Sequence, residues 1–149
     1  MERLLAAVDG SEHALRAVHL AAELAAPDGA ELHLLHVLTD TRSGRIPPGL
    51  EEYEHLEHLS ISEAELLRSA AEQMLATAAE HARAAGVEDV RCSVVRGDPA
   101  TVILTEASAL PSDLIVMGRR GLGDMVGLLL GSVSHKVTHH APCPVVTVP

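Results

Sequence analysis

The chain has 149 residues with 21 acidic and 11 basic side chains, and its formal net charge of −10 disfavours binding along a polyanionic nucleic acid. It has no Phe or Trp and one Tyr, so it lacks the aromatic platform on which single-stranded nucleic acids stack. The length fits one domain, residues 1–149, whose core must consist of small and branched aliphatic side chains.

The cysteine content and the N-terminal sequence bear on location. Cys92 and Cys143 lie far apart and form no C-x-x-C pair, so we expect no disulfide framework. The N-terminal residues lack the long apolar segment of a signal peptide, and no apolar run approaches the ~18 residues of a membrane span. These features predict a cytoplasmic protein.

The first third of the chain predicts a strand, a helix and a second strand. A buried strand is expected over residues 3–8, and the helix that follows stops at Pro27-Asp28-Gly29. The buried face of this helix is expected to comprise Leu15, Val18, Ala22 and Ala25. A second strand is expected over residues 31–38. Residues 39–61 carry two adjacent prolines, acids and histidines, which predicts a mobile loop.

A long helix is predicted after this loop, beginning at Ser60 or Ser62 and ending at Gly86. Each serine precedes a Glu by three positions, which is the spacing of a capping box. Glycine just after a helix is typical of its C-terminal end. The buried face is expected to comprise Leu67, Ala71, Met74, Ala78 and Ala85.

The last part of the chain predicts three more strands and two helices. In the segment 87–97, alternating residues from Val90 to Val95 predict an edge strand. Asp98-Pro99 then starts a helix that runs to about Ala109. Residues 113–118 form an apolar run typical of the centre of a parallel sheet. A short helix, with Val133 and Val137 one turn apart, and a final strand within residues 144–149 follow.

Strands that alternate with helices predict an α/β fold, a single open doubly wound five-stranded parallel sheet with helices on both faces. Ligands of such sheets bind beyond the carboxyl ends of the strands, where the winding reverses. The first and fourth strands end in Asp9-Gly10 and Gly118, which are rich in turn chemistry. We therefore expect a ligand in the crevice between these two strands.

The glycines after the fourth strand form the pattern G-x2-G-x9-G-S, with Gly118, Gly121 and Gly131-Ser132. Glycine lets the backbone approach a ligand closely. Gly131-Ser132 opens a helix whose first N–H groups lack internal partners, and those donors, the Ser132 hydroxyl and the helix dipole suit a phosphate. Neither the P-loop pattern nor the G-x-G-x-x-G dinucleotide pattern is present.

Taken together, these segments resemble the universal stress protein family over nearly the whole chain. The resemblance rests on VDGS (8–11), LLHVL (34–38), VVRGDP (94–99), DLIVMGRRG (113–121) and LLLGSVSHKVTHHAPCPVVTV (128–148). Within that family, G-x2-G-x9-G-S marks the branch that binds ATP. The resemblance implies an adenine-nucleotide alpha-hydrolase-like fold with strand order 3-2-1-4-5.

The resemblance also implies a set of nucleotide-binding residues. Asp9 matches a position that contacts the adenosine part, with Val8 and Gly10 beside it, and Val37 matches a residue that packs on adenine. The ribose and phosphate side would be lined by Gly118, Arg120 and Gly121, with Met117 next to them in the binding set. The phosphates would be held by Gly131, Ser132 and Val133.

Three further expectations follow from the same resemblance. Mg²⁺ would be held mainly by the phosphates and water, so no metal-binding side chains are assigned. The family pairs through its last strand, which here implies a homodimer formed by Val145, Val146, Thr147 and Val148. The function implied is an ATP-binding stress-response regulatory protein, in which nucleotide orders residues 39–61 and controls dimer or partner interactions.

Several interpretations stay open at the level of single residues. Asp9 suits a helix cap or an Asx turn as well as a nucleotide contact. Arg119 and Arg120 suit either a solvated surface or an anion. Asp124 departs from the family pattern by placing an acid near the expected phosphates, where it either repels a triphosphate or helps hold a metal. His55 and His58 lie among acids, which favours a solvated loop over a metal site.

Two other function classes compete with the regulatory protein. A slow ATPase or nucleotidyl-transfer enzyme would need a base, for which Asp124 or a nearby His is available, and a phosphate clamp, for which Arg119 or Arg120 is available. A phospho-receiver would need an acid at the end of the third strand, where Arg96-Gly97-Asp98 stands, and usually an acid pair after the first strand.

Overall fold

The computed structural model describes residues 1–39, 63–122 and 130–149. The two serines proposed as helix caps, Ser60 and Ser62, lie outside these ranges, as do Asp124 and nearly all of the predicted loop. The elements are β1 (Arg3–Ala7), α1 (Glu12–Ala25), a short 3-10 helix (Ala26–Asp28), β2 (Glu31–Leu38), α2 (Glu63–Ala84), β3 (Val90–Arg96), α3 (Pro99–Ala109), β4 (Leu114–Gly118), α4 (Ser132–His140) and β5 (Val145–Val148).

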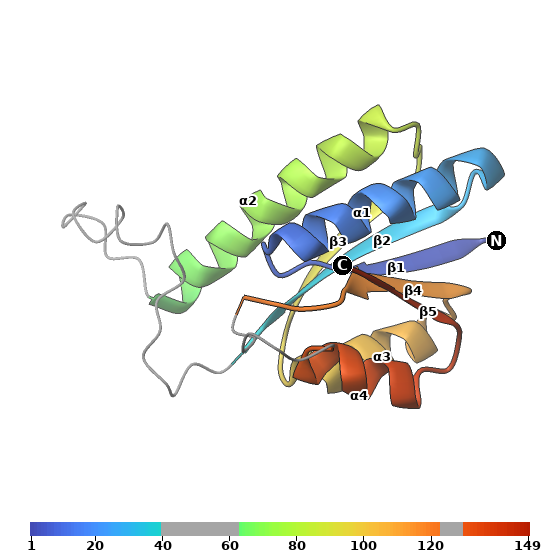
Figure 1. Cartoon of the computed structure of the whole chain (residues 1–149). Coiled ribbons are helices and arrows are strands. Elements are labelled where there is room, and N and C mark those ends of the chain that lie inside the picture. Colours follow the sequence, from blue (N-terminus) through green and yellow to red (C-terminus); the bar gives the residue numbers. More distant parts are fainter. Residues whose placement is uncertain (40–62, 123–129) are drawn as a thin grey trace.

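The strands form one parallel sheet in the order β3-β2-β1-β4-β5, which confirms the predicted fold and strand order. Helices α1 and α2 cover one face of the sheet, and α3 and α4 cover the other (Figure 1). The chain moves outward from β1 through β2 to β3, and then returns to the other side of β1 with β4. The winding therefore reverses between β1 and β4, whose carboxyl ends meet where Ala7 pairs with Met117.

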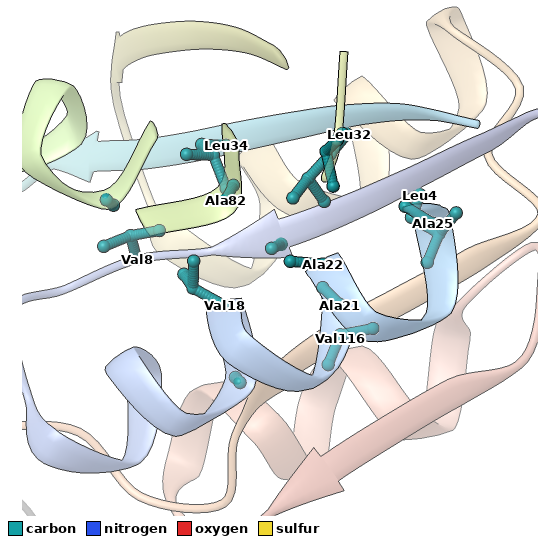
Figure 2. Packing of buried hydrophobic residues seen from close by; sticks show 14 of the residues in the cluster. Leu4, Val8, Val18, Ala21, Ala22, Ala25, Leu32, Leu34, Ala82 and Val116 are labelled. Atoms are coloured by element: carbon teal, nitrogen blue, oxygen red, sulfur yellow. The ribbon is translucent and has the colours of Figure 1, made fainter. Parts of the chain in front are cut away.

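Each face of the sheet carries its own aliphatic core. Along β1, Leu4 and Ala6 face α1 and α2, whereas Leu5 faces α3 and α4, because successive strand residues point to opposite faces. Figure 2 shows part of the first core, where Leu34 of β2 lies near Ala82 of α2 and Leu4 of β1 lies near Ala25 of α1. The largest fully buried side chains of the described residues are Leu, Ile and Val, as the composition predicted.

Alanines make most of the buried face of α1, and this differs from one prediction. Leu15, expected in the core, is 38% exposed. The buried residues of α1 are Ala14, Ala17, Val18, Ala21, Ala22 and Ala25. The helical spacing of apolar residues favoured the bulky Leu15. In the structure, small side chains occupy the face that lies on the sheet, because they allow the helix to approach the sheet closely.

The buried face of α2 is also rotated from the predicted one. Ala71 and Ala78 are buried as expected, but Ala85 lies beyond the end of the helix and is exposed. Leu67 and Met74 are half-buried. The buried residues of α2 are Ala71, Leu75, Ala78, Ala79 and Ala82. Gly86, with a φ of 99°, ends the helix as predicted, and its N–H donates to the carbonyl of Arg83 at 2.9 Å.

The start of α3 follows the sequence prediction closely. The Asp98 carboxylate accepts the N–H of Thr101 at 3.0 Å and its hydroxyl at 2.8 Å. These hydrogen bonds from Thr101 hold the pKa of Asp98 below its ordinary value. Pro99 occupies the first helical position, as expected after such a cap.

Ion pairs and hydrogen bonds fasten the amino ends of the strands, opposite the edge where the ligand is expected. The Asp113 carboxylate accepts the N–H groups of Glu2 and Arg3, which lowers its pKa. Glu31 pairs with Arg3 at 2.9 Å and with Arg91 at 3.3 Å, and its pKa is lowered mainly by the hydrogen bond from Arg3. These contacts join β4, β1, β2 and β3 at one end of the sheet.

Cys92 and Cys143 are both free thiols. None of the helices in the described ranges is long and apolar enough to cross a bilayer.

Candidate functional site

The turn after β1 is held by hydrogen bonds among its own residues. Oδ1 of Asp9 accepts the N–H of Ser11 at 2.9 Å, which forms an Asx turn, and Gly10 between them has a φ of 84° that favours glycine. Ser11 then caps α1, since its Oγ accepts the N–H of Ala14 at 3.2 Å. Of the two local roles open for Asp9, the Asx turn is observed and the helix cap belongs to Ser11.

The second carboxylate oxygen of Asp9 faces the loop that follows β4. A Cβ atom placed on Gly121 would lie 2.7 Å from Oδ2 of Asp9, which is closer than real side-chain contacts allow. The missing side chain at position 121 therefore makes room for the carboxylate. The structure thus brings together two predicted site residues that are 112 positions apart in the sequence.

Gly118 has a packing role that the sequence did not reveal. A Cβ atom at this position would lie 2.8 Å from Cβ of His13 and 3.0 Å from both the Ala14 nitrogen and the Arg120 oxygen. The end of β4 therefore lies directly against the first turn of α1. Any side chain at this position would push the strand away from the helix and move the loop that begins there.

The loop after β4 is fastened to the start of α4 at one carbonyl group. The carbonyl of Arg119 accepts the N–H of Gly131 at 2.9 Å and the hydroxyl of Ser134 at 2.8 Å. The N–H of Arg119 donates to the carbonyl of Val148, on β5, at 2.7 Å. Residue 119 thus connects β4, β5 and α4, and it holds the first turn of α4 beside the end of β4.

The N-terminal end of α4 has no side-chain cap. Gly131 is its N-cap residue, with an extended backbone. The first N–H groups of a helix have no acceptor within the helix, and they carry the positive end of its dipole. Because the N–H of Gly131 is already bonded to Arg119, Ser132 and Val133 supply the amide donors; the Ser132 side chain is exposed and Val133 is half-buried.

Arg119 and Arg120 lie half-buried on the loop between β4 and α4. The Nε atom of each is buried and has no hydrogen-bond partner in the part of the chain that the structure describes. A buried donor without an acceptor is costly, so such atoms call for an explanation. A bound ligand with acceptor groups is one explanation for both atoms.

The predicted apolar residues of the site differ in how much side-chain surface they expose to a ligand. These residues are Val8, Met117 and Val37. The Val8 side chain is 3% exposed and belongs to the core beneath α1 and α2 (Figure 2), and Met117, 5% exposed, belongs to the opposite core. The Val8 N–H donates to the carbonyl of Leu35 at 2.8 Å. Only Val37 is half-buried, and it therefore keeps some apolar surface for a ligand.

Two further residues support the turn after β1 and were not predicted. His36, half-buried on β2, donates from Nδ1 to the carbonyl of Val8 at 2.7 Å, one residue before Asp9. Met74 of α2 lies next to the turn, because a Cβ atom at Gly10 would be 3.1 Å from its sulfur. Neither residue has a local sequence signal, since both reach the turn from other elements.

The sequence and the fold match those of known proteins. Residues 1–149 match the model of the Universal stress protein family, and the chain belongs to this family. A Thermus aquaticus protein, the "Universal stress protein in QAH/OAS sulfhydrylase 3'region", is 37% identical over 147 residues, which cover 97% of this chain and 96% of that protein.

Solved structures agree with this assignment. Universal stress protein UspA from Lactobacillus plantarum has a TM-score of 0.72 and 28% identity, covering 99% of this chain and 97% of its own. A universal stress protein solved in complex with cAMP has a TM-score of 0.68 and 27% identity, covering 99% and 95% of the two chains.

Proposed function

We propose that this chain binds an adenine nucleotide, ATP foremost, at the carboxyl ends of β1 and β4. The observation that carries the proposal is the start of α4. This helix begins without a side-chain cap, and the loop before it contains two arginines whose buried Nε atoms have no hydrogen-bond partner among the described residues. The similar universal stress protein solved with cAMP supports an adenine nucleotide as the ligand class.

The two ends of the nucleotide would meet different chemistry. The Asp9 carboxylate, beside Gly121, would accept hydrogen bonds from the adenosine part, and Val37 would pack on the base. The amides of Ser132 and Val133 and the Ser132 hydroxyl would bind the phosphates, aided by the helix dipole. The site thus has an acceptor end at β1 and a donor end at α4.

The donor end favours a nucleotide with a long phosphate tail. Two arginines and the α4 N-terminus supply positive potential, and each added phosphate adds acceptors for them. Mg²⁺ would arrive with the nucleotide, held by its phosphates and water, as is usual for this ion.

Calorimetry with ATP, ADP, AMP and cAMP, each with and without Mg²⁺, tests the proposal. We expect saturable binding that is tightest for ATP and that weakens in Ser132→Ala. Equal affinity for AMP and ATP would contradict phosphate binding at α4. No saturable binding of any of the four would overturn the proposed function.

Regulation through self-association is the second part of the proposal. β5 is an edge strand, and the carbonyl of Val148 faces β4, where it accepts the N–H of Arg119. Residues alternate along a strand, so the N–H of Thr147 faces away from β4 and is available to another chain. We expect a homodimer by light scattering and a monomer for Thr147→Pro, which removes this donor. A wild-type monomer would contradict this part.

We also propose that the protein is cytoplasmic and that bound nucleotide changes its choice of partner. Together these features describe a stress-response regulator. A slow ATPase remains the alternative. Its candidate base, Asp124, lies outside the described residues, so no observed geometry favours hydrolysis. Measuring phosphate release in the wild-type protein and in Asp124→Asn decides between the two, because an enzyme would lose turnover in the variant.

A further inference from the structure

His19 of α1 and His81 of α2 lie next to each other on the outer surface of the two helices. Their ring centroids are 5.7 Å apart, and the ring planes are tilted by 31°. Both side chains are exposed, and neither ring hydrogen-bonds to another residue in the described ranges. Two imidazoles from different elements thus meet at the surface with their nitrogen atoms uncommitted.

The alanine-rich packing of the two helices explains this meeting. His19 follows the buried Val18 on α1, and His81 precedes the buried Ala82 on α2. Helices that face each other through small side chains approach closely. The exposed residues that border the contact are therefore brought within reach of each other, and Figure 1 shows α1 and α2 side by side.

The separation of the rings suits a shared metal ion. With metal–nitrogen bonds of about 2.0–2.1 Å, two imidazoles on one ion have centroids roughly 5–6 Å apart. Imidazole nitrogen favours Zn²⁺, Cu²⁺ and Ni²⁺, whereas Mg²⁺ and Ca²⁺ favour oxygen. We propose that His19 and His81 form a binding site for a divalent transition-metal ion that bridges α1 and α2.

The two histidines fill only part of the coordination shell of the ion. Among the described residues, no third His, Cys, Asp or Glu joins the pair in a metal-binding group, so water or a small ligand fills the other positions. Structural zinc sites close with four protein ligands, whereas sites with fewer exchange their ions. The net charge of −10 attracts cations to the surface. The ion is therefore exchangeable, and occupancy follows the concentration of available metal.

Another histidine pair serves as a matched control. His135 and His139 are both on α4, with ring centroids 6.3 Å apart and planes within 5° of parallel. Two histidines one helical turn apart can also bind a single ion, so this pair is the competing candidate site within one helix. An ion held there would also bridge no second element. The α1–α2 pair differs in that it joins two elements, so it depends on the tertiary fold.

Cu²⁺ binding to the full-length chain tests the site by electron paramagnetic resonance and by calorimetry. With one equivalent of Cu²⁺ at slightly basic pH, where protons compete little for imidazole, we expect a spectrum with two imidazole nitrogens on the ion. His19→Gln and His81→Gln should each lower the affinity at least ten-fold. The double variant should lose less binding free energy than the two single variants combined, because both nitrogens serve one ion.

The His135→Gln/His139→Gln variant should retain the two-nitrogen spectrum and the affinity. Zn²⁺ should also raise the unfolding midpoint of the wild type and of this control, but not that of His19→Gln, because an ion that binds only the folded state stabilises it. An affinity and nitrogen count unchanged in His19→Gln/His81→Gln would overturn the proposal, as would their loss in the α4 variant alone. Because neither histidine belongs to the nucleotide site, these outcomes do not depend on the proposed function.

Discussion

Asp9 and Gly121 touch across the carboxyl ends of β1 and β4. One carboxylate oxygen of Asp9 accepts the N–H of Ser11, and the other occupies the space that a side chain at position 121 would need. Each contact constrains the other, because the Asx turn sets the direction of the carboxylate and the glycine leaves it room. Substitutions at either position should therefore affect stability and ligand binding to different extents.

Gly121→Ala and Gly118→Ala should have different effects. At position 121 the new methyl group meets the Asp9 carboxylate, which can move away at the cost of at most its hydrogen bond to Ser11. The free energy of unfolding should therefore fall by less than ~1 kcal/mol, while ATP affinity should fall about ten-fold. At position 118 it meets backbone atoms of α1, so the free energy of unfolding should fall by about 1–3 kcal/mol. Urea unfolding and calorimetry measure the two effects. Equal losses of stability would contradict the distinction.

Asp9→Asn and Asp9→Ala should separate the Asx turn from the charge. Asn keeps a side-chain oxygen that accepts the N–H of Ser11, so the turn and the stability should be retained. Ala removes the acceptor, and the free energy of unfolding should fall by ~1 kcal/mol. Both variants lose the carboxylate beside Gly121, so both should bind ATP more weakly. Wild-type affinity in Asp9→Asn would show that the carboxylate does not contact the nucleotide.

Ser134→Ala and Ser132→Ala compare two serines on the first turn of α4. Ser134 is 2% exposed, and its hydroxyl donates to the carbonyl of Arg119, so its loss should cost ~1 kcal/mol of stability. The Ser132 side chain is exposed, so its loss should leave stability unchanged and lower ATP affinity. Thermal unfolding and calorimetry distinguish the two. Stable, normally binding variants at both positions would contradict the role of this turn.

His33 should make stability depend on pH below neutrality. It is 3% exposed, its Nε2 lies 2.6 Å from the Ser93 hydroxyl, and its Nδ1 is buried without a partner in the described ranges. Burial lowers its pKa, against the opposing effect of Glu106. The unfolded chain then binds a proton that the folded chain resists, so stability should fall as the pH drops below about 6.5.

Urea unfolding at pH 7.5, 6.5 and 5.5 measures this dependence. We expect His33→Gln to lose most of the decline in this range, whereas the exposed His139→Gln keeps it. Below this pH range, the pH dependence of stability comes from three carboxyl groups, those of Asp98, Asp113 and Glu31. Their lowered pKa values mean that their contribution is present above the unfolded pKa and disappears as they protonate. A pH profile of His33→Gln identical to that of the wild type would contradict the assignment.

Local patterns were enough to predict the element order, the strand bounds to within one residue or two, and the cap of α3 at Asp98. These features depend on neighbours in the sequence, such as the Asp-Pro pair and uninterrupted apolar runs. The family resemblance then supplied the strand order, which the structure confirms. The glycine spacing pointed to Gly118, Gly121 and Gly131, each of which the structure places in a tight contact or at a helix start.

The sequence by itself thus determined the alternating α/β order and the place in the chain where turns and glycines gather. Only the tertiary structure decided which side chains meet there. Asp9 contacts Gly121, His36 holds Val8, and His19 reaches His81, although no spacing connects these pairs. The physical reason is that periodicity reports which residues face a core, whereas contacts between elements depend on how closely alanine-faced helices and neighbouring strands approach.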